Sequence, residues 1–153
     1  TRYKLVTGVQ TCALPISHAH PVSGVQALQA GTWSVSATST PATPTAITIN
    51  SAATTNATSS KASAGTLYGI ACSNTGGAAA FVKLYNKASA PTVGTDVPVL
   101  TITVPASGSV QVDWGALGYR CATGIALAIT NLAADTDTTA VAASQVKVTG
   151  SYI

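Results

Sequence analysis

Short runs in which apolar and polar residues alternate recur along the second half of the chain. Val110 and Val112, for example, alternate with Gln111 and Asp113. A spacing of two is the period of a β-strand, whose successive side chains point to opposite faces. Runs of this kind, or short apolar runs bounded by Gly and Pro, predict strands at residues 46–50, 66–73, 80–86, 97–104, 109–114, 125–130 and 145–153.

This succession of short strands predicts an all-β domain over residues 45–153. No segment shows an apolar stripe of helical period, and residues 52–64 are expected to hold at most one helical turn because β-branched threonines disfavour a longer helix. Strands at such spacing are typical of an antiparallel β-sandwich, here expected to be jelly-roll-like. The residues expected to form one core are Val82, Leu84, Ile125, Leu127, Ile129, Val146, Val148 and Tyr152.

Residues 18–44 have a different composition, rich in Ser, Thr, Ala, Pro and Gln. One strand-like island at residues 31–36 carries Trp33 and Val35, and Pro41 and Pro44 then interrupt any regular element. We expect an extended stalk or linker. Because so short and polar a segment cannot bury a core, Trp33 and Val35 are predicted to mediate self-association of the chain as a homo-oligomer.

The N-terminal segment does not resemble natural protein sequence. Residues 6–16 read VTGVQTCALPI, which matches a translation of a common sequencing-library adapter. We therefore interpret residues 1–17 as an artefact and expect the natural polypeptide to begin near His18. The absence of methionine fits a reading frame cut at its 5′ end in unassembled metagenomic DNA, and such segments are excluded from fold reasoning.

Charge is scarce throughout the chain. Charged residues make up 7% of it, against about 25% in average proteins. Without Arg2 and Lys4 of the N-terminal segment, five basic residues face four aspartates, with no basic cluster. Nucleic acid is therefore not an expected partner. Nor is membrane insertion expected, since no apolar run approaches the roughly 18 residues that a spanning helix needs.

The groups that usually carry acid–base catalysis are missing from the predicted β domain. Glutamate is absent from the chain, and its only histidines are His18 and His20. Serine and threonine hydroxyls without a base are not activated nucleophiles. The sequence predicts a protein that is not an enzyme and that uses no cofactor.

Two pairs of residues are candidate metal ligands. His18 and His20 would lie on one side of a strand, and Asp135 and Asp137 offer carboxylates among threonines, as calcium sites do. The more frequent situations are a frayed terminal pair of histidines and aspartates that shape a turn. No metal site is therefore expected.

Cys72 and Cys121 both fall in strand-like sequence. A disulfide between them and two separate buried thiols remain alternatives, because the sequence does not give the distance between their Cα atoms.

Aromatic residues offer a second pair of alternatives. An exposed set could stack on sugar rings, whereas aromatics within alternating strands usually pack in a core or between subunits. Core packing is the favoured interpretation. The residues concerned are Trp33, Tyr68, Tyr85, Trp114, Tyr119 and Tyr152.

Three runs, at residues 83–98, 124–130 and 133–141, resemble virion structural proteins of tailed bacteriophages. The upstream residues 25–35 look like the Gln-x-Gly-Thr-Trp units that precede such domains. This resemblance implies a non-enzymatic structural protein of the virion, a tail fibre or capsid-decoration protein, with a C-terminal β domain. It also shifts the expected homo-oligomer from the commoner twofold dimer to a trimer. The expected partners are other virion proteins and, at the tip, a host-surface glycan.

The alternative class is a bacterial cell-surface adhesin or a carbohydrate-binding β-sandwich module. For the favoured class the expected location is the extracellular particle, assembled in the bacterial cytoplasm.

Overall fold

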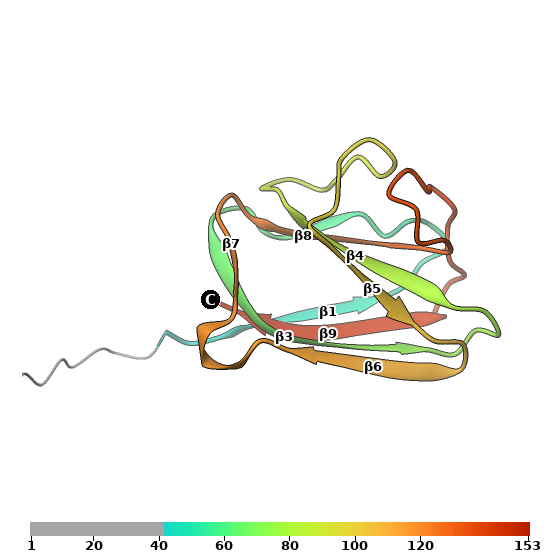
Figure 1. The fold of residues 1–153 in the computed structure, drawn as a ribbon, viewed down its shortest axis with the longest axis horizontal. Helices are drawn as coiled ribbons and strands as arrows, with labels where there is room; N and C mark the ends of the chain where they lie inside the picture. Colours follow the sequence, from blue (N-terminus) through green and yellow to red (C-terminus); the bar gives the residue numbers. More distant parts are fainter. Residues whose placement is uncertain (1–41) are drawn as a thin grey trace, which may run out of the picture. The chain divides into compact units, whose positions relative to one another are not determined.

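The computed structural model describes residues 42–153, which form two antiparallel sheets packed face to face (Figure 1). The all-β sandwich predicted from the sequence is confirmed. One sheet, called sheet A, contains β1 (Thr45–Asn50), β3 (Gly65–Asn74), β6 (Gly108–Asp113), β7 (Tyr119–Cys121) and β9 (Val146–Tyr152). Sheet B contains β2 (Thr58–Lys61), β4 (Ala80–Asn86), β5 (Leu100–Val104) and β8 (Ile125–Thr130).

The pairing of strands is nested along the chain. The innermost pair is β4 with β5, followed outward by β3 with β6, β2 with β8, and β1 with β9. Folding this long antiparallel hairpin over itself gives the orders β1-β9-β3-β6 and β2-β8-β4-β5. Eight strands in this arrangement are a jelly roll, and β7 is an addition that pairs with the start of β3.

The space between the sheets is filled by aliphatic side chains from alternate positions of each strand. Every residue predicted to lie in the core is there, with Tyr152 only partly buried at its margin. Because the strand period is two, the same pattern that fills the core also determines which side chains face outward. The outward faces of the two sheets differ, and the candidate site lies on one of them.

Two strands and one boundary differ from the sequence-based prediction. β2 lies where at most a helical turn was expected, because Thr58–Lys61 pairs with β8 at a sheet edge and leaves all four residues half-buried, without alternation. β7 has only three residues, too few to show a period. β5 begins at Leu100 rather than at residue 97; Pro98, which lacks a backbone N–H, precedes it.

A sharp turn leads into β7. A 3₁₀ turn at Gly115–Leu117 ends at Gly118, whose φ is +65°. A Cβ at Gly118 would collide with Thr66 and lie 3.0 Å from the Leu67 carbonyl oxygen. Glycine is therefore required here both for the left-handed backbone and for the close approach to β3.

Candidate functional site

The outer face of sheet B is covered by two long connections. The segment between β4 and β5 (residues 87–99) and the segment between β8 and β9 (residues 131–145) lie over it (Figure 1). Beneath them Tyr85, Ala126 and Ala128 are buried and pack with Val93 in a small second cluster. We call these residues, together with Lys83 and the two segments, the covered layer.

Lys83 is a fully buried cation in the covered layer. It points outward from β4, because Val82 and Leu84 on either side of it belong to the inner core. Its Nζ donates a hydrogen bond to the carbonyl oxygen of Ala134, at 2.6 Å. The ammonium group thereby ties the 131–145 segment to the middle of sheet B, and a charge-assisted bond of this kind is stronger than a neutral one.

Asp137 organises the same segment from within. Its carboxylate accepts hydrogen bonds from the backbone N–H of Leu132 at 3.0 Å and from the hydroxyl of Thr139 at 2.7 Å. Burial raises the pKa of the Asp137 carboxyl, but these bonds and the Lys83 charge outweigh it, so the pKa lies below its ordinary value. Asp137 is thus a turn-shaping residue.

Asp135, the other candidate calcium ligand, is exposed at the surface. Within residues 42–153 no three His, Cys, Asp or Glu side chains come together as metal ligands would. His18 and His20 lie outside the described residues.

The hydroxyl of Tyr85 is buried without a hydrogen-bond partner among the described residues. Tyr85 is only 1% exposed. Burial raises the pKa of its phenol, and the nearby carboxylates of Asp135 and Asp96 raise it further. This phenol is therefore held in its neutral form, unsuited to acting as a base near neutral pH.

An ion pair closes the 87–99 segment of the covered layer. Lys87 pairs with Asp96, which also accepts a hydrogen bond from the backbone N–H of Thr92 at 2.6 Å. The Lys87 side chain and this backbone bond lower the pKa of the Asp96 carboxyl. Both partners are partly exposed, so the pair fixes the loop more than it stabilises the fold.

Cys72 and Cys121 are both buried and both free. Cys121 pairs across the ladder with Gly65 of β3, while Cys72 lies seven residues further along that strand. At about 3.3 Å per residue this separates them by roughly 20 Å, far beyond disulfide reach. Burial raises the pKa of the Cys72 thiol to about 11 and also raises that of Cys121, so both are inert structural thiols.

The aromatic residues do not form a flat exposed array. Trp114 and Tyr119 lie with their ring centroids 5.6 Å apart at a tilt of 46° and pack against the inner core. The Tyr152 hydroxyl donates to the Ser60 carbonyl oxygen at 2.7 Å. Packing thus accounts for Trp114, Tyr119 and Tyr152, while Tyr68 is half-buried on β3. Trp33 and Val35 lie outside the described residues.

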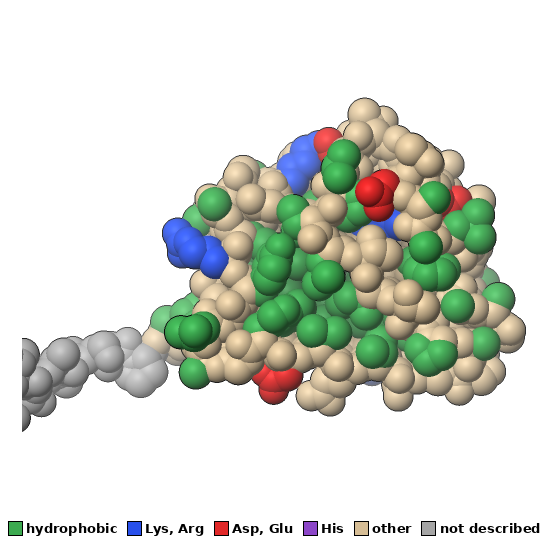
Figure 2. Space-filling model, viewed as in Figure 1, with side chains coloured by type: hydrophobic (Ala, Val, Ile, Leu, Met, Phe, Trp, Pro, Cys, Tyr) green, Lys and Arg blue, Asp and Glu red, His purple; other side chains and the backbone are tan. Residues whose placement is uncertain are grey.

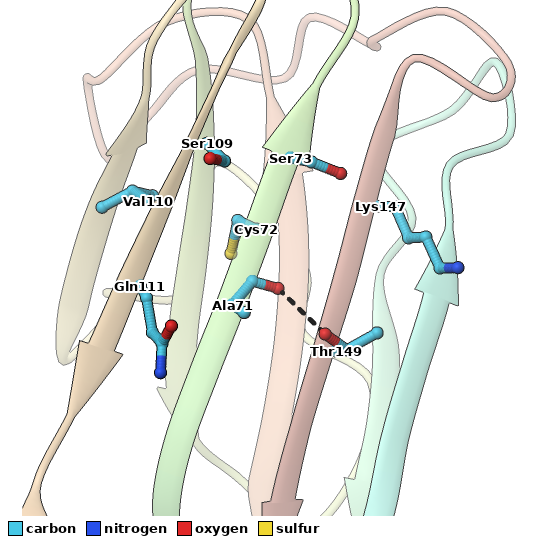
Figure 3. A pocket seen from close by; sticks show the side chains of 8 residues that line it. All are labelled: Ala71, Cys72, Ser73, Ser109, Val110, Gln111, Lys147 and Thr149. Atoms are coloured by element: carbon cyan, nitrogen blue, oxygen red, sulfur yellow. Dashed lines mark hydrogen bonds between the residues drawn. The ribbon is translucent and has the colours of Figure 1, made fainter.

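The outer face of sheet A is open. A shallow depression of about 340 Å³ lies over β6, β3 and β9 (Figure 3). Small and polar side chains such as Ser73, Gln111 and Lys147 line it, and the Thr149 hydroxyl lies 3.4 Å from the Ala71 carbonyl oxygen. No sequence motif distinguishes these residues, so the depression has no signal along the chain.

The polar groups of the covered layer are used to hold loops, and they do not converge on the depression in sheet A.

No helix within residues 42–153 has the length and apolarity to cross a membrane. No protein-family model matches the chain, and no curated protein matches it either.

Proposed function

We propose that this chain is a non-enzymatic structural protein of a tailed-phage virion, of fibre or capsid-decoration type. Its copies assemble as a homo-oligomer, a trimer being favoured, and present one end of the β domain to the host surface. The particle is extracellular and is assembled in the bacterial cytoplasm.

One observation carries the proposal. The three runs that resemble phage virion proteins, residues 83–98, 124–130 and 133–141, meet in the covered layer. β4 pairs with β8 over six residue pairs, four of which join the first run to the second, and Lys83 donates a hydrogen bond to Ala134 of the third run. Runs that are separate in sequence but adjacent in space are what a shared structural element would give, rather than a chance likeness of composition.

The fold is compatible with this role. Jelly rolls occur in viral capsid domains and in lectins, but a fold alone does not determine a function. The composition also supports the proposed role, because a charge-poor surface with hydroxyl side chains suits a protein that stays exposed on a particle. The inert thiols and the neutral Tyr85 phenol offer no catalytic group.

The alternative, a bacterial adhesin or carbohydrate-binding module, is favoured by the depression in sheet A, which is lined by hydroxyl, amide and ammonium side chains from three adjacent strands (Figure 3). Against it, no aromatic side chain lines that depression, and stacking on aromatics is a common source of sugar affinity.

Sequencing the DNA on both sides of this reading frame separates the two proposals. Capsid, portal or tail genes beside it support the virion role. Glycoside hydrolase or secretion genes would overturn that role in favour of the adhesin or sugar-binding module. Peptides of this chain in density-purified particles from the same source would be the biochemical counterpart.

A further inference from the structure

The two sheets expose their edges on the same side of the sandwich. β5 is an end strand of sheet B and β6 is an end strand of sheet A, and neither pairs with a further strand within the described residues. Apolar side chains gather between these two edges on the face shown in Figure 2. On the two edge strands, Leu100, Val110 and Val112 are partly buried and pack against the inner core.

Exposed aliphatic side chains extend this apolar strip along the chain to the residues before β5. Val97 and Val99, which precede β5, are 73% and 44% exposed and are among the four exposed large aliphatic side chains of the described residues. β5 itself carries no charge, no proline and no bulge along its pairing with β4. Free edges of monomeric proteins usually have at least one of these protections.

The other side of the sandwich differs. Its edge strand in sheet B, β2, has four residues, ends in Lys61 and has an irregular register with β8. β1, the edge in sheet A, is uncharged, but the exposed large aliphatic residues lie outside it. An unprotected edge and an exposed apolar strip therefore coincide only at β5 among the described strands.

We propose that β5 is a self-association site, at which a second copy of this chain pairs its own β5 in antiparallel orientation. The sequence of β5 is self-complementary for such a twofold contact. With Ile102 opposite its counterpart, Thr101 faces the partner's Thr103 on the outside, and Leu100 faces the partner's Val104 on the inside. Opposed β-branched residues stabilise a ladder.

Charge favours a copy of the chain as the occupant. A twofold axis places each residue near its own counterpart, so any charge at the contact would repel itself. β5 has no charged side chain, and Asp113 terminates the neighbouring edge strand β6. Asp96, which precedes Val97, is already paired with Lys87. An acidic or basic peptide would find no charge to pair with on this edge.

The size of the contact sets its strength. A strand of five residues is about 17 Å long and the sheets lie about 10 Å apart, so each copy contributes a few hundred Å². Stable complexes bury about 800 Å² per partner. The pairing should therefore be reversible and concentration-dependent, with any N-terminal contact adding to it.

The inference rests on the proposed function in one respect: assembly on a particle brings copies of the chain together. The test is sedimentation equilibrium of the full chain and of Thr103→Lys, at concentrations from about 5 to about 200 μM, a range that brackets micromolar dissociation constants. Thr103 is exposed on the outer face of β5, so the substitution spares the core. Thr48→Lys, at an exposed position of the other edge strand β1, is the matched control.

We expect the wild type and Thr48→Lys to show a reversible, concentration-dependent step that doubles the mass, in addition to any trimer formed through the N-terminal segment. Thr103→Lys should weaken this doubling step at least tenfold. Circular dichroism of each variant confirms that it folds. A wild type without a concentration-dependent step, or a step unaffected by Thr103→Lys, would overturn the β5 pairing. Loss of the step in Thr48→Lys alone would place the contact at β1. A trimer that forms equally well in Thr103→Lys, with no doubling step, would refute the β5 pairing. The proposed virion role would not be affected, because the flanking genes test it independently.

Discussion

The two outer faces of the sandwich use the same strand period in opposite ways. In β6, on sheet A, residues alternate between half-buried and exposed, as in a sheet with one wet face. In β8, on sheet B, all six residues are buried. The difference arises because residues 87–99 and 131–145 cover sheet B, whereas the outer face of sheet A remains open (Figures 1 and 3).

Residues 87–99 and 131–145 thus form a third layer on the sheet B side of the sandwich. Side chains that the alternation would place in water, such as Lys83 and Tyr85, are instead enclosed. Each then needs a partner: Lys83 has one in Ala134, and Tyr85 has none among the described residues. Matched substitutions on the two faces test whether the covered layer contributes to stability.

The largest effect is expected for Ala126→Asp in the covered layer. Ala126 is fully buried on the outer side of β8, so the substitution places an unpaired carboxylate beneath the two segments. We expect a loss of about 3–5 kcal/mol in unfolding free energy, or no folding. The control is Ala71→Asp on the open face, which should change it by less than about 1 kcal/mol. Urea denaturation measures both; equal losses would contradict the comparison.

A smaller effect is expected when the buried lysine is replaced. Lys83→Met keeps the length of the side chain but leaves the Ala134 carbonyl oxygen without its donor, at a cost of about 1.5–3 kcal/mol. Hydrogen exchange of residues 131–145 should accelerate. Lys147→Met, at an exposed position of β9, should be neutral within about 0.5 kcal/mol. Similar stability and exchange in both variants would mean that the ammonium does not hold the segment.

The same substitution should have opposite signs at two tyrosines. Tyr85→Phe removes a buried hydroxyl that has no partner, so stability should stay constant or rise by up to about 1 kcal/mol. Tyr152→Phe removes a bond to Ser60 and should cost about 1 kcal/mol. Thermal denaturation compares the two. A clear loss in Tyr85→Phe would show that its hydroxyl has a partner in solution.

The subtlest test is acid pH. The pKa values of Asp96 and Asp137 are lowered in the folded chain, so the stability they contribute is present above the ordinary aspartate value of 3.8. It is lost as the pH falls through their lower folded values. Hydrogen exchange between pH 5 and about pH 2 should show the two segments opening before sheet A does. Asp137→Asn should flatten this dependence in residues 131–139, and Asp113→Asn, at the end of β6, should not.

The sequence predicted much of the fold because alternation and glycine or proline breaks are local signals. Seven of the strands were expected near their observed positions. β2 (Thr58–Lys61) was missed because it lies at a sheet edge and its residues do not alternate, and β7 (Tyr119–Cys121) because three residues are too few to show a period. The core residues followed directly from the strand period. The covered layer could be predicted only in part. The carboxylates Asp135 and Asp137 are visible in the sequence, but the alternation of β4 predicts that Lys83 is exposed, and its burial could not be foreseen.

By itself, the sequence determined the fold class, the core face of each strand, and the poverty of charge and catalytic groups, since these depend on composition and on neighbours along the chain. Tertiary structure decided the rest. Only the nested pairing of strands brings residues 83–98 beside residues 133–141 and so encloses Lys83. The same pairing keeps Cys72 apart from Cys121 and leaves β5 at an edge. Contacts between distant segments arise from closing long loops over a sheet, and no local pattern encodes which face those loops will cover.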